Sequence, residues 1–533
     1  MSEILRMEDL QIVARGDDGQ VRTLVDRVSL TLQRGEVLGL IGESGAGKST
    51  IGLAALAYTR PGCEIAGGHI VFDGTDSLTL SRGERRRLRG RRIGYVAQSA
   101  AASFNPAKQL DTQVCETPVR LGMLSGAQAR AEAATLYAEL GLPSPLSFGR
   151  RYPHQVSGGQ LQRAMAAMAM ACRPDILVLD EPTTALDVTT QIEVLAALKK
   201  LVRNHGTAAL YITHDLAVVA QIAQRILVLR HGRLVEVGET GQILHRPEQE
   251  YTRRLVAARE AADTIMHAAA EADEAILSLR GIDAQYGRLP VLKSVDLDVR
   301  RGETMAVVGE SGSGKSTLAR VICGLPPTGT GSMRFTGKVL PPRFRERGRD
   351  ALRRIQMVYQ MPDVALNPHQ TILQTIGRPL AFYFGLKPAA VRERVADLLR
   401  MVELPLEFAA RKPGQLSGGQ KQRICIARAL AAEPELMICD EVTSALDPLV
   451  ADEILALLQR VQEKTGVSYL FITHDLGTVR RIADRVTVML RGEVVAQGPL
   501  AEVFAPPYHP YTELLLTSVP EMRTDWLDSA LQR

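Results

Sequence analysis

The chain has 533 residues, of which 45% are hydrophobic and 23% are charged. This is the ordinary mix of a folded protein, so the composition excludes a disordered or fibrous chain, and at roughly 150 residues per domain the length predicts several domains. The 64 Lys and Arg residues nearly balance the 59 Asp and Glu residues. A net charge of +5 therefore gives no indication of the dense basic face that is typical of nucleic-acid binding.

The cysteines and the start of the chain favour a cytoplasmic protein. None of the six cysteines forms a CxxC pair, so the sequence predicts neither a zinc site nor a redox motif. Scattered cysteines in a long chain are typical of reduced, cytosolic proteins. Residues 1–6 lack the basic and apolar regions of a signal peptide, and no apolar run approaches the roughly 18–20 residues of a membrane helix. Docking on a membrane protein stays open.

The first half of the chain alternates apolar strands with helical patterns. Alternating apolar residues predict a strand at Val28–Leu32, and apolar runs predict buried strands at Val37–Ile41, Ile93–Ala97, Ile176–Leu179 and Ala208–Ile212. Strands that alternate with helices favour a mainly parallel α/β sheet. Residues 99–160 show mostly helical patterns, so we expect them to form a separate lobe.

A glycine-rich segment follows the strand Val37–Ile41 and matches GxxxxGK[ST], the pattern of a phosphate-binding loop. Its glycines allow backbone N–H groups to surround phosphate oxygens, and the next helix offers its positive N-terminus. We expect Lys48 to reach the β- and γ-phosphates and Ser49 to offer a hydroxyl to Mg²⁺. The predicted nucleotide-binding residues of this loop are Gly42, Ser44, Gly45, Gly47, Lys48, Ser49 and Thr50.

Polar residues end two of the later strands. Asp180 and Glu181 follow Ile176–Leu179. A carboxylate in this position can hold Mg²⁺ through water, and the adjacent Glu can act as general base on the attacking water. His214 lies just after Ala208–Ile212, and we expect it to contact the γ-phosphate.

A second phosphate-binding surface is predicted at Ser157–Gln160. The Ser-Gly-Gly-Gln run is typical of a helix start with exposed backbone donors. Because the glycine-rich loop already surrounds the phosphates of its own half, this surface makes sense if it serves nucleotide bound to the other half. Its residues are Ser157, Gly158, Gly159 and Gln160. Gln98 closes the strand Ile93–Ala97, where a glutamine by itself indicates nothing.

The second half of the chain repeats the first. The loop Gly42–Thr50 returns 267 residues later as Gly309–Thr317, and the interval from the loop lysine to the strand-end glutamine is 50 residues in the first half and 45 in the second. Residues 257–275 hold nine alanines and are predicted to form a helical linker, and residues 361–415 are the second helical lobe. The repeated candidate residues are Gly309, Ser311, Gly312, Gly314, Lys315, Ser316, Thr317, Gln360, Ser417, Gly418, Gly419, Gln420, Asp440, Glu441 and His474.

With these motifs in this order, the chain resembles an ABC ATPase that carries two nucleotide-binding domains in one polypeptide. The resemblance covers nearly all of the chain and rests on the Walker A, Q-loop, signature, Walker B and H-loop motifs and on the D-loops Ala185–Asp187 and Ala445–Asp447. It implies an α/β fold with two tandem P-loop NTPase domains, each with a RecA-like core, an antiparallel β subdomain and a helical subdomain. The implied domains are 1–256 and 276–499, joined by linker 257–275 and followed by a C-terminal extension at 500–533.

The resemblance also implies two composite sites. The two halves would enclose two ATP molecules head to tail, each held by the Walker A loop of one half and the signature of the other. ATP would close the halves and hydrolysis would reopen them. The implied catalytic residues are Glu181, His214, Glu441 and His474. The implied Mg²⁺ ligands are Ser49, Gln98 and Asp180 in one site and Ser316, Gln360 and Asp440 in the other.

Three positions depart from the family pattern. Tyr286 fits the aromatic residue that stacks on adenine in the second half, but the equivalent stretch Leu10–Arg15 has no aromatic residue, so we expect weaker stacking there. Val442 stands where proline usually follows the Walker B glutamate, and Val156 replaces the usual signature leucine. Because no reacting group is lost, we expect both sites to hydrolyse ATP.

Two further elements resemble importers of peptides and nickel. Asn105-Pro106 and Leu366–Pro368 follow the Q-loop glutamines, and the tail Pro506–Leu515 resembles the C-terminal element of that branch, with a degenerate copy at His245–Thr252. Some relatives bind an iron–sulfur cluster through cysteines in this extension, but no cysteine follows Cys439, so no cluster is expected. ATP and Mg²⁺ are the implied cofactors.

The importer resemblance implies a complete transport system. This chain would drive uptake of peptides or a related small solute through two integral membrane permease subunits, which form a heterodimer. An extracytoplasmic solute-binding protein would deliver the solute. One copy of this chain would serve each transporter, as a peripheral protein on the cytoplasmic side of the inner membrane.

Two other classes fit less well. A soluble twin-ABC ATPase acting on ribosomes usually has Glu at the last signature position, where this chain has Gln160 and Gln420. A DNA-repair or chromosome-associated ABC protein would need zinc fingers or coiled-coil insertions. The arginine runs Ser81–Arg92 and Arg343–Arg354 could bind a phosphate backbone, but both end six residues before a Q-loop glutamine. We interpret them as a solvated helical face and expect no nucleic-acid partner.

Overall fold

The computed structural model describes residues 2–16, 20–183, 186–264, 274–325, 330–444 and 446–531. It divides into two units. Unit 1 comprises Met1–Arg259 together with Pro520–Arg533, and unit 2 comprises Glu260–Val519. The chain thus leaves unit 1 after Arg259, and its last residues belong to unit 1 again. The predicted boundaries at 256 and 275 stay a prediction, and residues 265–273 of the predicted linker, Ala185 and Ala445 lie outside the described residues.

Unit 1 contains two sheets. The antiparallel sheet comprises β1 (Glu3–Arg15), β2 (Val21–Gln33), β4 (Cys63–Phe72) and β5 (Thr75–Asp76) in the order β2-β1-β4-β5. The larger sheet comprises β3 (Val37–Gly42), β6 (Ile93–Val96), β7 (Ile176–Asp180), β8 (Ala208–Ile212), β9 (Arg225–Arg230) and β10 (Arg233–Glu239) in the order β10-β9-β3-β8-β7-β6. Strands β9, β3, β8, β7 and β6 are parallel, and β10 is antiparallel to β9.

The structure confirms the predicted strands. Their apolar pattern has a physical reason, because parallel strands that are covered on both faces must be apolar throughout. Every residue of β3, β7 and β8 is buried. The carboxyl ends of these parallel strands lie at one edge of the sheet, which is where ligands bind in such folds. Gly42, Asp180 and Ile212 end their strands at this edge.

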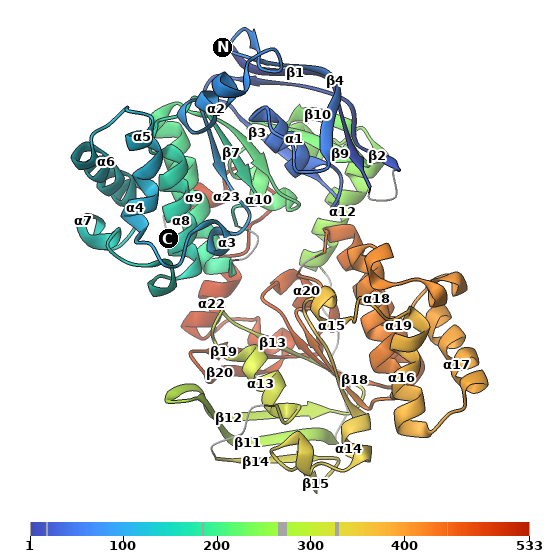
Figure 1. Cartoon of the computed structure of the whole chain (residues 1–533). Helices are drawn as coiled ribbons and strands as arrows, with labels where there is room; N and C mark the ends of the chain where they lie inside the picture. Colours follow the sequence, from blue (N-terminus) through green and yellow to red (C-terminus); the bar gives the residue numbers. More distant parts are fainter. Residues whose placement is uncertain are drawn as a thin grey trace. The chain divides into compact units, whose positions relative to one another are not determined.

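The helices of unit 1 include the predicted lobe. They are α1 (Lys48–Ala55), α2 (Arg82–Arg91), α3 (Ala100–Ser103), α4 (Leu110–Val114), α5 (Glu116–Arg120), α6 (Gly126–Glu139), α7 (Pro145–Phe148), the 3₁₀ helix η1 (Pro153–Gln155), α8 (Gly158–Met170), α9 (Val188–His205), α10 (Leu216–Ala220), α11 (Thr240–His245), α12 (Glu250–Thr264) and α23 (Trp526–Ala530). Figure 1 shows α4 to α7 gathered on one side of unit 1, away from the antiparallel sheet. The prediction that residues 99–160 are mostly helical is confirmed.

Unit 2 repeats this plan. Its antiparallel sheet has the order β12-β11-β14-β15, built from β11 (Ala275–Tyr286), β12 (Leu289–Arg300), β14 (Ser332–Phe335) and β15 (Lys338–Val339). Its larger sheet has the order β16-β17-β18-β13-β19-β20, built from β13 (Thr304–Val308), β16 (Ile355–Val358), β17 (Leu436–Asp440), β18 (Ser468–Ile472), β19 (Arg485–Leu490) and β20 (Glu493–Pro499). The order is that of unit 1 listed from the other edge.

The helices of unit 2 follow the same succession. They are α13 (Lys315–Ile322), η2 (Phe344–Glu346), α14 (Arg349–Arg354), α15 (Pro362–Ala365), α16 (Ile372–Phe384), α17 (Pro388–Met401), η3 (Leu406–Ala410), η4 (Pro413–Gln415), α18 (Gly418–Leu430), α19 (Pro448–Thr465), α20 (Leu476–Ile482), α21 (Leu500–Val503) and α22 (Pro510–Thr517). In the described part of the chain, no helix has the length and apolar character needed to cross a membrane.

One apolar core joins the two sheets of each unit. In unit 1, Leu5 of the antiparallel sheet, Leu38 of β3 and Ile51 of α1 belong to the same buried cluster. In unit 2, Leu277 and Leu318 belong to the equivalent cluster. The helix that follows each glycine-rich loop is therefore fixed between two sheets, and this packing sets the position of the loop.

Candidate nucleotide sites

The loop between β3 and α1 has the backbone of a phosphate-binding loop. Gly42, Gly45 and Gly47 have backbone φ angles of 148°, 81° and 94°, values that a residue with a side chain adopts only with strain. A Cβ on Gly42 would lie nearer than 3.0 Å to the backbone oxygen of Leu229, whereas a Cβ on Gly45 would meet no atom within 4 Å. Gly42 is therefore required by packing, and Gly45 lines open space that a ligand can use.

The lysine of each loop is buried and satisfied by the loop itself. The Lys48 Nζ donates to the carbonyl oxygen of Gly42 at 2.6 Å and to that of the next residue at 2.9 Å. Lys315 makes the same two bonds to Gly309 and the residue after it, both at 2.7 Å. A buried ammonium needs such partners, and these hold the charge beside the loop backbone that would surround phosphate.

A hydroxyl and a carboxylate lie together in both units, as the sequence predicts. The Ser49 Oγ donates to the Asp180 Oδ1 at 2.8 Å, and the Ser316 Oγ donates to the Asp440 Oδ1 at 3.0 Å. Burial raises the pKa of Asp440 above its usual value, although the hydrogen bond from Ser316 opposes the shift. Hydroxyl and carboxylate oxygens are the donors that Mg²⁺ prefers, so both pairs fit that ion.

Sequence reasoning missed Tyr95. Its hydroxyl donates to the second carboxylate oxygen of Asp180 at 2.7 Å, from the neighbouring strand β6. The equivalent position in β16 is Met357, which has no hydroxyl to donate. The predicted strand Ile93–Ala97 contains this tyrosine, but only the pairing of β6 with β7 places it beside the carboxylate. The two carboxylates therefore differ in their surroundings.

A glutamate, a glutamine and a histidine meet at the end of β7. The Gln98 Nε2 donates to Glu181 at 2.9 Å, and the His214 Nδ1 lies 3.4 Å from the other oxygen of the same carboxylate. Glu181 has φ of 48°, a left-handed conformation that costs about 1 kcal/mol in a residue with a side chain. Its N–H donates to the carbonyl oxygen of Ile212 at 2.9 Å, which helps to hold this conformation.

Unit 2 has the same arrangement. The Gln360 Nε2 donates to Glu441 at 2.7 Å, and the His474 Nδ1 lies 3.3 Å from the other carboxylate oxygen. Glu441 has φ of 50°, and its N–H donates to Ile472 at 2.9 Å. Because two independent copies adopt the same strained conformation, the direction of each glutamate is a property of the strand end and the loop after it.

The charge states in this cluster follow from the contacts. Burial lowers the pKa of His214 and His474, but the hydrogen bond and charge of the adjacent glutamate outweigh it, so both pKa values lie above the usual one. Burial raises the pKa of Glu441, but the hydrogen bond and charge of His474 and the charge of Lys315 outweigh it and lower the pKa. Glu441 is therefore ionised at neutral pH and can accept a proton from water.

The signature runs form helix N-termini, as predicted. Ser157 precedes α8, its Oγ accepts the Gln160 N–H at 3.3 Å, and the Gln160 side chain accepts the Ser157 N–H at 3.3 Å, which is a capping box. Ser417 and Gln420 form the same box before α18. Among the described residues of unit 1, Ser157–Gln160 make no hydrogen bond to the loop Gly42–Thr50.

The glycines of the signature are needed for helix packing. A Cβ on Gly159 would lie nearer than 3.0 Å to Thr190 of α9, and a Cβ on Gly419 would lie nearer than 3.0 Å to Val450 of α19. Gly158 has room, since its nearest neighbour would be Leu186 at 3.8 Å. One glycine of each pair therefore serves the fold, and the other keeps backbone donors accessible.

Tyr286 ends β11 and is 45% exposed, so its ring is available to a ligand. The strand pairing identifies its counterpart in unit 1. Ile12 pairs with Val25 as Ala284 pairs with Leu292, and Ala14 and Tyr286 each lie two residues further along. An alanine thus occupies the position of the predicted adenine-stacking ring in unit 1.

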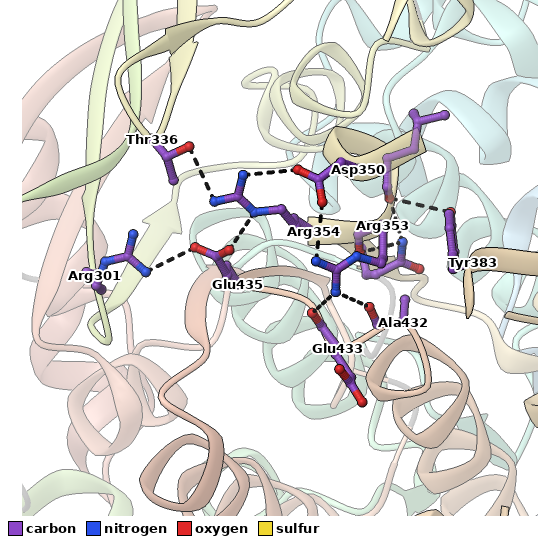
Figure 2. Close-up of polar contacts among 11 residues, drawn as sticks. Arg301, Thr336, Asp350, Arg353, Arg354, Tyr383, Ala432, Glu433 and Glu435 are labelled. Atoms are coloured by element: carbon purple, nitrogen blue, oxygen red, sulfur yellow. Dashed lines mark hydrogen bonds and ion pairs between the residues drawn. The ribbon is translucent and has the colours of Figure 1, made fainter. Parts of the chain in front are cut away.

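The arginine runs are only partly the solvated face that the sequence indicated. Figure 2 shows Arg354 bonded to Asp350, Thr336 and Glu435. It also shows Arg353 bonded to the carbonyl oxygens of Ala432 and Glu433, at the end of α18. These side chains join α14 to the two sheets and to the segment that follows α18, so they are part of the fold.

Two glycine-rich loops, each with a hydroxyl–carboxylate pair and a Glu–His pair on an α/β sheet, define the ATP-binding cassette class of P-loop ATPases. The family model described as "ABC transporter" matches residues 25–184 and 292–444. The model described as "Oligopeptide/dipeptide transporter, C-terminal region" matches residues 495–532. The chain therefore belongs to the ABC transporter family, as the resemblance implied, and is an ATP-hydrolysing subunit that binds ATP.

Two relatives that align with nearly the whole chain agree with this assignment. Glutathione import ATP-binding protein GsiA of Salmonella typhimurium is 38% identical over 560 residues, covering 97% of this chain and 90% of that protein. The Escherichia coli (strain K12) protein of the same name is 37% identical, covering 97% and 89%. These two relatives do not favour the ribosome-associated class, and family membership implies membrane permease partners. The solved structure of cbiO1 from Clostridium perfringens, part of the ABC transporter complex cbiONQ, is 31% identical, covering 44% of this chain and 92% of that chain, with a TM-score of 0.40.

Proposed function

We propose that this chain is the motor subunit of an importer for peptides or a related small solute such as glutathione. The C-terminal region and the names of the relatives support this substrate class. The proposed partners are a heterodimer of permease subunits and an extracytoplasmic solute-binding protein, with one copy of this chain per transporter on the cytoplasmic face of the membrane. No nucleic-acid partner is proposed.

The observation that carries the proposal is the duplicated geometry of the two sites. In each unit the loop lysine, the serine and the carboxylate end at the same sheet edge, where they are proposed to hold the phosphates and Mg²⁺. Bound Mg²⁺ would neutralise phosphate charge. The proposed ligands are Ser49, Gln98 and Asp180 in unit 1 and Ser316, Gln360 and Asp440 in unit 2. The glutamine side chains lie beside the glutamates, at 2.9 Å and 2.7 Å.

Glu181 and Glu441 are proposed to take the proton of the attacking water. His474 holds Glu441 in its ionised form and keeps one of its oxygens oriented, and His214 lies in the same position beside Glu181. Gln360 donates to the other oxygen of Glu441. A carboxylate fixed from two sides loses little entropy when it accepts the proton, which favours general-base catalysis.

Each site is proposed to be completed by the signature of the other unit. The capping boxes leave Gly158 and Gly418 exposed at the starts of α8 and α18, and the Ser157–Gln160 run makes no bond to the loop of its own unit in the described residues. The dipole of each helix start would then meet phosphate charge. Nucleotide bound between the units would hold them together until it is hydrolysed.

The test uses the double substitution Glu181→Gln/Glu441→Gln. It removes both carboxylates without changing side-chain size, so ATP binding should persist while turnover falls about 100-fold or more. The tagged double variant is incubated with ATP and detergent-solubilised native membranes and captured, and its partners are identified by mass spectrometry, with Lys48→Ala/Lys315→Ala as the matched control whose affinity for ATP is reduced. Recovery of two permeases with a binding protein supports the importer. Undiminished ATPase activity contradicts the catalytic assignment, and capture of ribosomal proteins or DNA without permeases contradicts the transport assignment.

A further inference from the structure

The C-terminal element has a contact with the phosphate-binding loop that the ATPase chemistry does not explain. Tyr511 lies in α22 and is buried, and its hydroxyl accepts a hydrogen bond from the backbone N–H of Glu310 at 2.8 Å. Glu310 is the residue directly after Gly309, the first glycine of the loop in unit 2. A side chain about 200 positions further along the chain therefore reaches the loop backbone itself.

This contact acts on the same peptide group as the loop lysine. The peptide that joins Gly309 to Glu310 offers its carbonyl oxygen to the Lys315 Nζ at 2.7 Å and its N–H to the Tyr511 hydroxyl at 2.8 Å. The peptide plane is thus fixed at both ends. Because Gly309 has φ of 149° and no side chain, its own steric preferences do not fix the orientation of this peptide. The tyrosine therefore supplies a restraint that the loop sequence lacks.

The element is built to hold the tyrosine still. His509 caps α22, and its Nδ1 accepts the Tyr511 N–H at 3.2 Å. Pro510 occupies the first helical position, where its fixed φ favours the helix start. Thr512 and Leu515 are buried on the same helix. The capped helix start and the buried residues of α22 therefore fix the position of the tyrosine, whose hydroxyl contacts the loop.

Unit 1 offers a second version of this arrangement. Tyr251 is buried, and the Arg230 guanidinium lies over its ring at 4.8 Å from the centroid. The same Arg230 lies 3.8 Å from the carboxylate of Glu43, the residue that follows Gly42. In unit 1, Tyr251 is thus linked to the loop residue Glu43 through Arg230. In unit 2, Tyr511 contacts the equivalent residue, Glu310, directly.

We propose that Tyr511 is a positioning residue for ATP binding in unit 2, and that this is one role of the C-terminal element. By fixing the Gly309–Glu310 peptide, it keeps the Lys315 ammonium at the loop, from which the side chain extends to phosphate. This role concerns only the ATP-binding activity of the family and is independent of the proposed transported solute.

The test is nucleotide binding and steady-state turnover by the full chain, without permeases, carrying Tyr511→Phe. The ring stays and the acceptor is lost, so we expect the Kd for a slowly hydrolysed ATP analogue at the unit 2 site to rise about three- to tenfold, the effect of one hydrogen bond. KM should rise with it while kcat changes little. The matched control is Tyr508→Phe, which removes a hydroxyl three residues earlier in the same element.

Two results obtained with Lys315 in place would overturn the proposal. One is an analogue Kd for Tyr511→Phe equal to that of Tyr508→Phe. The other is a loss of affinity that is accompanied by an equal loss of kcat and a lower melting temperature, since that pattern indicates general damage to the unit. A Lys315→Ala background separates the cases further. If Tyr511 acts through the lysine, Tyr511→Phe should cause no additional loss of affinity there, and a full additional loss contradicts the mechanism.

Discussion

Two glycines of the phosphate-binding loop should respond differently to substitution by alanine. Gly42 is required by the fold, and Gly45 is required by the ligand. A methyl group on Gly42 would press against the backbone oxygen of Leu229, which lies opposite it in the pairing of β3 with β9. Overpacking of this kind costs about 2 kcal/mol and the positive φ about 1 kcal/mol more. A methyl group on Gly45 meets nothing within 4 Å and costs only the φ term, about 1 kcal/mol.

These energies give measurable differences in stability. At about 3 °C per kcal/mol for a unit of this size, Gly42→Ala should lower the melting temperature of unit 1 by about 9 °C and Gly45→Ala by about 3 °C. The order of effects on ATP affinity should be reversed at temperatures where both variants are folded, because the methyl group at residue 45 enters the space that phosphate would occupy. Scanning calorimetry and titration with an ATP analogue measure the two quantities.

The equivalent glycines of unit 2 allow the same comparison within the same chain. Gly309 has a φ of 149° and its Cβ would press against the backbone oxygen of Met489, and Gly312 has a φ of 82° and open space around it. Gly309→Ala and Gly312→Ala should therefore reproduce the pair. Equal melting temperatures for Gly42→Ala and Gly45→Ala, or unchanged ATP affinity in Gly45→Ala, would refute the assignment of packing to one glycine and ligand contact to the other.

Two further predictions concern the pair formed by His474 and Glu441 and the position of the proposed adenine-stacking ring. Because the pKa of His474 is raised, the stability of its protonated pair with Glu441 is fully present below the ordinary pKa of 6.5 and is lost as pH rises through the folded value. His474→Gln should remove that part of the fall in unfolding free energy as the pH rises above 6.5, as measured by urea titration; an identical pH profile contradicts it. Tyr286→Ala should weaken ATP binding in unit 2 about fivefold or more, and Ala14→Tyr should strengthen it in unit 1, since aromatic stacking on a base contributes about 1–3 kcal/mol. Unchanged affinity in both variants would show that neither position stacks on the base.

The sequence predicted what depends on short runs of residues. The glycine-rich loops, the apolar strands β3, β7 and β8 and the helix starts at Ser157 and Ser417 are encoded within a few positions of each motif. Repetition then strengthened each local pattern, because two copies with the same spacing rarely arise by chance. For this reason the amino-acid sequence alone was enough to predict the fold class and the local structure of the Walker and signature motifs.

Contacts between distant segments could not be predicted in this way. Tyr95 lies in an ordinary strand pattern, and only the register of β6 against β7 brings its hydroxyl to Asp180. The arginine run at Arg343–Arg354 has the composition of a solvated helix. In the folded chain, however, Arg353 and Arg354 donate hydrogen bonds to residues that lie just beyond the ends of other elements.

The tertiary structure alone also decided where the end of the chain belongs. Gln221, just after α10, donates from its side chain to the carbonyl oxygens of Glu521 and Arg523 at 3.0 Å and 2.8 Å and accepts from the Leu527 N–H at 3.0 Å. Trp526 is 3% exposed. The sequence thus determined the local chemistry of this protein, because propensity, capping and phosphate binding act over a few residues. The structure decided which side chain serves which site, because burial and hydrogen bonding act between segments hundreds of residues apart.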